Sequence, residues 1–353
     1  MELIKKYNEW VKTLFPYNDK KIFIWLFPGG LGDKISCFPA FRHLKKTYPD
    51  RKIVLYTEPL SIDIWKSCCY IDYIIPEDCV APDGLFIRKN IDLANKACWS
   101  FFEHHQKHIC KSNVEYICNT SYTNDIPLEY EMSYWQEDID SIYKIQEGID
   151  QKCKGKKVIG IAPAYTMYSR MWSKESWTKL TELLKEAGYY VVSLGGNNDL
   201  DISNIDLDLR NKIPIRMVPK VLDFFDNVIT LNSGMLHLAS VNQNVPITYL
   251  NVGQFPAELI VPYRKGKLFH KVKVIEHNCP MKKECFQGHI TETAIRPMMY
   301  DFLDNYKKET GEDYPEKRIE LMKKYVCWHY CAKIIAKYSC SRLITPEMVM
   351  EKL

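Results

Sequence analysis

The sequence has no apolar run long enough to cross a membrane. Its longest runs, such as residues 22–27, have the length of a β-strand, far below the ~20 residues that a spanning helix needs. The first residues, MELIKKYNEW, also lack the apolar stretch of a secretory signal. We therefore expect a cytoplasmic protein. In a reducing cytosol most of its 13 cysteines should be free thiols rather than disulfides.

Neither charge sign is in large excess. The 48 basic and 44 acidic residues leave a net charge of only +4, which argues against a nucleic-acid-binding surface. Apolar residues make up 46% and charged residues 26%, the proportions of an ordinary globular protein. At 353 residues the chain is too long for one compact core and fits two domains of about 150–200 residues each.

Short apolar runs alternate with helical patterns in both halves of the chain. Strands are expected at residues 21–27, 52–57, 73–75, 157–162, 189–194, 227–231 and 245–249. Helical patterns follow several of them, and the polar residues 146–157 are the best linker candidate. This order predicts an α/β protein with two doubly wound, Rossmann-like domains, 1–150 and 151–353, that face a ligand cleft. Residues 80–150 give no clear pattern.

A glycine-rich turn, residues 29–34 (GGLGDK), joins the first expected strand to a helix. It is not a P-loop, which needs four residues between its glycines and a Ser or Thr after the Lys. It is not a dinucleotide fingerprint either, because Ile35 stands where the third glycine belongs. What remains is a turn that brings backbone, such as Gly32, close to a ligand. It presents Asp33 as either a helix cap or a general base that the helix dipole keeps ionised.

Two later loops contain groups that suit a diphosphate. Residues 163–172 (PAYTMYSRMW) include the hydroxyl of Thr166 and the guanidinium of Arg170, which binds phosphate oxygens in a bidentate manner. The alternative is a surface Arg beside a core Trp172. Gly195 and Gly196 end another expected strand and are expected to border a nucleotide.

The third motif is residues 232–237 (NSGMLH), which run from a strand through a turn into a helix. Ser233 and the amides of Ser233 and Gly234 are expected at a helix N-terminus, where anions bind readily. His237 falls in the first helical turn. It either points to the same anion or is a hydrogen-bonded core histidine.

The turn GGLGD (29–33) followed by FPAF (38–41), and the later LNSGMLHLA (231–239), resemble the heptosyltransferase-like glycosyltransferases of family 9. The resemblance implies a GT-B fold and an inverting transfer of heptose or hexose from a nucleoside-diphosphate sugar, with ADP-heptose favoured. It assigns Asp33 as the base, Arg170 to the donor diphosphate, and Ser233, Gly234 and His237 to the donor-phosphate loop.

Two departures accompany the resemblance. Asn232 stands where the family's loop usually has an acidic residue, and RMWS (170–173) replaces Lys-x-Trp-Pro.

The resemblance also implies that no cofactor is required for the chemistry, and that the acceptor would be a glycan, a lipid-linked or a protein hydroxyl. The alternatives are a glycosyltransferase that acts on modified DNA bases and a non-catalytic nucleotide-sugar-binding protein, which Asn232 leaves open.

Five cysteines lie late in the chain, at 279, 285, 327, 331 and 340. Their spacing allows either free thiols or four thiolates around a structural iron or zinc ion. Protein O-heptosyltransferases that modify autotransporters have a four-cysteine iron site in this region. Similarity to them implies the set Cys279, Cys285, Cys331 and Cys340, with Cys327 as the substitute for Cys331. The charged, helical insertion at about 279–340 would serve acceptor docking or homo-oligomerisation.

Overall fold

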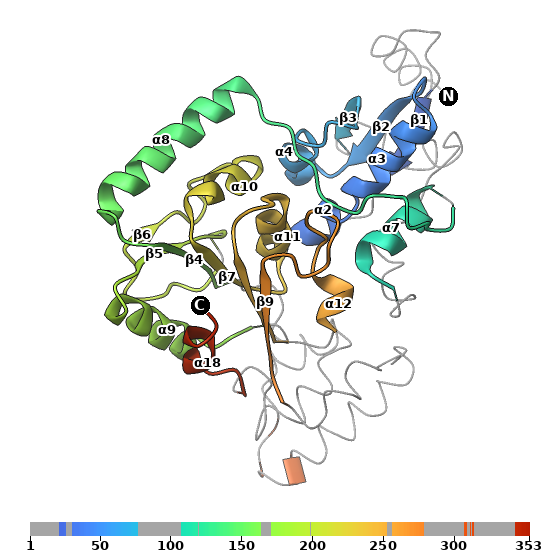
Figure 1. Ribbon diagram of the computed structural model, residues 1–353. Coiled ribbons are helices and arrows are strands. Elements are labelled where there is room, and N and C mark those ends of the chain that lie inside the picture. Colours follow the sequence, from blue (N-terminus) through green and yellow to red (C-terminus); the bar gives the residue numbers. More distant parts are fainter. Residues whose placement is uncertain are drawn as a thin grey trace.

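The computed structural model describes residues 21–25, 30–76, 107–118, 120–163, 171–197, 199–252, 256–278, 307–308, 311, 313 and 343–353. Within them two parallel sheets lie in different parts of the molecule (Figure 1). The first sheet has the order β1-β2-β3, and its strands are β1 (Lys21–Trp25), β2 (Lys52–Thr57) and β3 (Tyr73–Pro76). All three occur where the apolar runs predict them.

The helices beside the first sheet follow the same apolar patterns. They are α2 (Leu31–Ile35), α3 (Phe38–Thr47), η1 (Pro59–Ser61), α4 (Ile62–Trp65) and α7 (Ile109–Cys118). Helix α3 buries Phe38, Phe41 and Leu44, which recur at helical spacing, and both phenylalanine rings contact the ring of Trp65. The later segment 120–134 also belongs to this part of the molecule, because Arg42 donates to the carbonyl oxygens of Pro127 and Glu129.

The second sheet contains six parallel strands in the order β6-β5-β4-β7-β8-β9. They are β4 (Val158–Ala162), β5 (Tyr190–Ser193), β6 (Leu207–Asp208), β7 (Asn227–Leu231), β8 (Ile247–Asn251) and β9 (Val272–Glu276). Counted along the chain this order is 3-2-1-4-5-6, that of the doubly wound dinucleotide-binding fold. Every position of β4, β5, β7 and β8 is buried, because helices cover both faces of the sheet.

Alternate residues of the second sheet belong to two apolar cores. On one face Ile159, Ile161 and Ile229 pack with Trp172 and Trp177, under α9 (Lys174–Glu186) and α18 (Pro346–Met350). The indole N–H of Trp172 donates to the carbonyl oxygen of Ile344 at 2.9 Å, so the last described segment completes this core.

The other face of the second sheet shares one continuous core with the first sheet. It lies against the remaining elements: α8 (Gln136–Cys153), η4 (Ile215–Met217), α10 (Val218–Val221), η5 (Leu222–Phe224), α11 (Gly234–Val241) and α12 (Ala257–Ile260). Helix α8 occupies residues 146–153 of the expected linker, and Lys154 and Gly155 follow it with φ values of 52° and 77°. The domain boundary near residue 150 stays a prediction.

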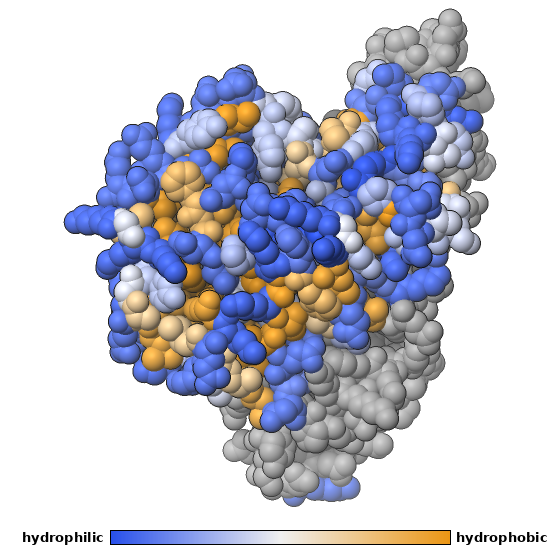
Figure 2. Space-filling model, in the orientation of Figure 1, coloured by the Kyte–Doolittle hydropathy of each residue, from blue (hydrophilic) through white to orange (hydrophobic). Residues whose placement is uncertain are grey.

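Polar contacts also join the two parts. Arg216 in η4 donates to Asp138 of α8 at 2.7 Å and to Asp63 of α4 at 2.8 Å, and its guanidinium lies 4.9 Å from the centre of the Trp135 ring. His108, just before α7, bonds to the carbonyl oxygen of Val261 at 2.9 Å. Figure 2 shows the surface hollowed between the part with α8 and the part with β1 and β2. The two sheets are thus docked by specific bonds across a shared core.

Candidate functional site

The strand order of the second sheet determines where a ligand should bind. In doubly wound sheets ligands bind beyond the carboxyl ends of the strands, where the strand order reverses. Here that point lies between β4 and β7, which pair directly. Helix α11 starts from the end of β7, and it packs against α2 of the first part (Figure 1). The first and third sequence motifs therefore meet at the switch point.

Asp33 lies in the first turn of α2. Its Oδ2 accepts the backbone N–H of Gly30 at 2.8 Å, so the side chain caps the start of its own helix. Its carbonyl oxygen accepts the Ser36 hydroxyl at 2.6 Å, and Asn113 of α7 donates to that hydroxyl at 2.7 Å. The cap interpretation of Asp33 is therefore present in the structure. It fixes the position of the carboxylate, and it is compatible with a role as base.

The close packing of α2 against α11 requires a glycine on each helix. A Cβ on Gly234 would lie 2.8 Å from Cβ of Leu31, and a Cβ on Gly32 would lie 2.6 Å from Cδ2 of His237. Real Cβ atoms hardly ever approach heavy atoms so closely, so the backbones of α2 and α11 pack closely only because both positions lack a side chain. Ser233 is the N-cap of α11 and accepts the N–H of Met235 at 3.3 Å.

His237 is buried, with only 4% of its surface exposed. Its Nδ1 lies 2.9 Å from the hydroxyl of Tyr130, and the two rings stack with centroids 5.9 Å apart. His237 is thus a hydrogen-bonded buried histidine that borders the turn containing Asp33, and its contact with an anion stays a prediction. No sequence pattern marks Tyr130, which lies in a segment without regular secondary structure.

Two helix N-termini meet at this point, and each has a partial positive charge from its unpaired amides. On the far side of Asp33, the Lys34 ammonium lies 2.5 Å from Oε1 of Glu58, at the end of β2. Burial alone would raise the pKa of Glu58, but hydrogen bonds from Lys34 and Ser61 outweigh it and hold the pKa below its usual value. This ion pair balances the Lys34 charge locally.

The glycines after β5 form a constrained turn at the same edge of the sheet. Gly195 has φ of 133°, and a Cβ there would lie 2.1 Å from Oδ2 of Asp199. The same oxygen accepts the N–H of Gly196 at 2.8 Å. Because β5 pairs with β4, this turn lies beside the loop that follows β4. Its contact with a nucleotide stays a prediction, as do the ligand contacts of Asn232, which is buried at the end of β7.

Several predicted site residues lie outside the described residues: Thr166, Arg170, Cys279, Cys285, Cys327, Cys331 and Cys340. The diphosphate contacts of the first two and the metal set of the others stay predictions. In the described part of the chain, no group of three or more His, Cys, Asp or Glu side chains is arranged to hold a metal ion. Nor does any helix there have the length and apolarity to span a bilayer.

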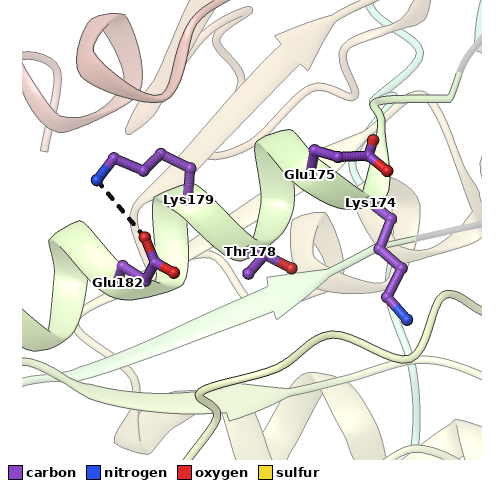
Figure 3. A pocket seen from close by; sticks show the side chains of 5 residues that line it. All are labelled: Lys174, Glu175, Thr178, Lys179 and Glu182. Atoms are coloured by element: carbon purple, nitrogen blue, oxygen red, sulfur yellow. Dashed lines mark hydrogen bonds and ion pairs between the residues drawn. The ribbon is translucent and has the colours of Figure 1, made fainter.

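A shallow hollow on α9 lies apart from these motifs. Its lining is Lys174, Glu175, Thr178, Lys179 and Glu182 (Figure 3). All five side chains come from one helix, and Lys179 pairs with Glu182 at 3.5 Å. It contains none of the predicted site residues, and we interpret it as a solvated helix face.

Comparison with known proteins agrees with the geometry. Residues 96–248 match the model of glycosyltransferase family 9 (heptosyltransferase). Lipooligosaccharide heptosyltransferase 2 of Campylobacter jejuni is 23% identical over an alignment of 308 residues that covers 78% of this chain and 96% of that protein. These two matches indicate a glycosyltransferase that is similar to the heptosyltransferases of family 9, and the family match spans less than half of the chain.

Solved structures bear out the predicted fold of this glycosyltransferase. The ADP-heptose LPS heptosyltransferase II of Escherichia coli superimposes with a TM-score of 0.56 at 14% identity, over 79% of this chain and 98% of that one. The iron-containing dodecameric glycosyltransferase TibC of enterotoxigenic E. coli gives 0.51 at 14% identity, over 80% of this chain and 76% of that one. The α/β class and the paired Rossmann-like sheets of the GT-B type are therefore confirmed.

Proposed function

We propose that this glycosyltransferase moves a heptose from ADP-heptose to a glycan hydroxyl, with inversion at the anomeric carbon and Asp33 as the base. The contact between Gly32 and His237 is the observation that carries the proposal. It brings the carboxylate-bearing turn of the first part against the anion-binding turn of the second. A base and a site for the leaving group are then neighbours on two different parts of the fold.

The donor end of the site is the beginning of α11. The amides of Ser233 and Gly234 and the edge of His237 are suited to stabilise a diphosphate, because preorganised donors at a helix N-terminus act without reorganisation. Arg170 and Thr166 from the loop after β4 would add to these contacts, and Gly195 and Gly196 would border the nucleotide. ADP-heptose is the donor in the name of the E. coli neighbour, which supports this choice.

The reaction is a single displacement. The acceptor oxygen forms a bond to the anomeric carbon while the bond from that carbon to the diphosphate oxygen breaks, and the electron pair leaves with the diphosphate. The hydroxyl proton passes to the Asp33 carboxylate, which is ionised before the step and neutral after it. One attack from the face opposite the leaving group inverts the anomeric centre.

A glycan acceptor is supported by the Campylobacter relative, which acts on lipooligosaccharide and is covered over 96% of its length. A protein or lipid-linked hydroxyl and a modified DNA base are the other acceptors to include in a test. Cytoplasmic location, cofactor-free chemistry and homo-oligomerisation stay predictions.

The substitution Asp33→Asn tests the base. Asn keeps an oxygen that can accept the Gly30 N–H, so the cap survives while the basic carboxylate is lost. We expect transfer from ADP-heptose, measured as ADP release with a truncated lipooligosaccharide, to fall by about 100- to 10,000-fold. Thermal stabilisation by the donor should persist.

The matched control is Asp125→Asn, at an exposed turn. It should behave as the unsubstituted protein. Near-normal turnover by Asp33→Asn would leave Asp33 only its role as a cap and refute the assignment. Transfer to proteins alone, detected by mass spectrometry, would refute the glycan acceptor.

A further inference from the structure

One hydroxyl group joins the two parts of the molecule beside the site. Tyr130 lies between α7 and α8, and only 2% of its surface is exposed. Its Oη is 2.9 Å from Nδ1 of His237 and 3.4 Å from Sγ of Cys110 in α7. A tyrosine from the part with Asp33 is thus bonded to a histidine of the donor-binding helix.

The proton order in this chain of three groups follows from their chemistry. Burial raises the pKa of Tyr130 well above 10 and that of Cys110 to about 12, so both keep their protons at neutral pH. The phenolic proton can be given to Nδ1 or to Sγ. An imidazole nitrogen is a much better acceptor than a thiol sulfur, so Tyr130 donates to Nδ1 and the Cys110 thiol donates to Oη.

The opposite edge of the imidazole faces α2. A Cβ on Gly32 would lie 2.6 Å from Cδ2 and 3.0 Å from Nε2 of His237, so this edge borders the place where α2 and α11 begin. When Nδ1 accepts a hydrogen bond, a neutral imidazole has its proton on Nε2. An N–H at this edge is a donor suited to a diphosphate oxygen, whereas a bare nitrogen lone pair would repel it.

We propose that Tyr130 is a positioning residue that holds His237 as the tautomer with its proton on Nε2, aimed at the diphosphate of the sugar donor. The inference rests on the proposed function for the identity of the ligand. The assignment of the tautomer uses the bond between Tyr130 and His237 and does not require the ligand to be known. Because that bond crosses between the two parts, the donor-side histidine is oriented by the part that contains the base.

Nitrogen NMR of protein labelled at histidine tests the tautomer directly. The His237 resonances are assigned by their loss in His237→Gln. We expect Nδ1 of His237 to show the shift of an unprotonated nitrogen and Nε2 that of a protonated one at pH 7.5. In Tyr130→Phe we expect a mixture of tautomers. A proton on Nδ1 in the unsubstituted protein, or an unchanged Nε2–H form in Tyr130→Phe, would overturn the inference.

Kinetics test whether Tyr130 acts through His237. Tyr130→Phe should lower kcat with ADP-heptose by about 10- to 100-fold, because a misplaced proton on His237 loses the hydrogen bond from Nε2 to the charged diphosphate. In a His237→Ala background the same change should alter kcat by less than about twofold, because the two effects share one interaction. An equal loss in both backgrounds would overturn the inference.

The matched control is Tyr122→Phe, which removes a hydroxyl that donates to the Ile126 carbonyl oxygen at 3.2 Å in the same segment. It should change kcat by less than about twofold if only the Tyr130 hydroxyl acts through His237. If the unsubstituted protein uses no nucleotide sugar, the proposed function fails, and the NMR result still decides the tautomer.

Discussion

The close approach of α2 and α11 gives a prediction whose size follows from the structure. In Gly32→Ala the new Cβ would lie 2.6 Å from Cδ2 of His237. Carbon atoms in contact prefer separations of about 3.5–4.0 Å, so the gap must widen by about 1 Å. The imidazole cannot simply turn away, because Nδ1 is bonded to Tyr130 and the ring stacks on that residue. The two helices must therefore move apart.

This separation should affect stability and activity differently. Overpacking of this kind costs about 1–3 kcal/mol of unfolding free energy. A shift of about 1 Å in a catalytic group costs on the order of 100-fold in rate. We therefore expect Gly32→Ala to remain folded, with a slightly lower unfolding temperature, and to lose most of its sugar transfer. Circular dichroism melting and ADP release measure the two quantities.

Two further variants make the Gly32→Ala result specific. Gly148→Ala lies within α8, where a Cβ meets nothing within 4 Å. It should stabilise the protein by about 1 kcal/mol without changing transfer. Gly32→Ala combined with His237→Ala removes the clash, so the combined loss of stability should be smaller than the sum of the two single losses, while activity stays low. Full activity and unchanged stability in Gly32→Ala would show that the helices do not approach as described.

Two other predictions concern buried groups away from the reacting atoms. Burial lowers the pKa of His108 from 6.5 to about 4, so the folded protein holds it neutral. The contribution of neutral His108 to stability is complete above pH 6.5 and is lost as pH falls towards 4, at up to about 1.4 kcal/mol per pH unit. When the unfolding free energy is measured with denaturant across this pH range, it should fall less steeply with decreasing pH in His108→Gln than in the unsubstituted protein. Arg264 is fully buried and donates to the carbonyl oxygens of Asn242, Val245, His270 and Lys271. Arg264→Met should therefore lower the unfolding free energy by about 3–5 kcal/mol, whereas Arg51→Met, whose guanidinium stacks on Tyr48, should change it by less than about 1 kcal/mol.

Strands with continuous apolar runs are predictable from the sequence, whereas β6 and β9 are not, for physical reasons. β6 is only two residues long, and β9 is an edge strand in which the exposed Lys273 and Glu276 interrupt the apolar residues, so neither produces an apolar run. Strand β8 begins and ends two residues later than expected, at Ile247–Asn251. Pro246 removes a backbone donor at the point where the strand begins.

The candidate site was predictable where local chemistry marks it and not where distant packing makes it. Asp33 and Ser233 stand in turns whose composition alone points to a ligand. The contact of Gly32 with His237 joins positions more than 200 residues apart, and nothing in either motif specifies that distance. Tyr130 and Asn113 act through tertiary contacts from segments without a recognisable motif.

The bond from Trp172 to Ile344 has a consequence for biosynthesis. The core that lies under α9 is completed by residues 343–353, which are translated after every strand of the second sheet. The first sheet can assemble while the chain is still emerging from the ribosome, but the outer core of the second sheet stays incomplete until α18 has been synthesised. A chain released before this segment would lack the partner of the Trp172 indole and leave the core under α9 incomplete, which exposes apolar surface to chaperones and proteases.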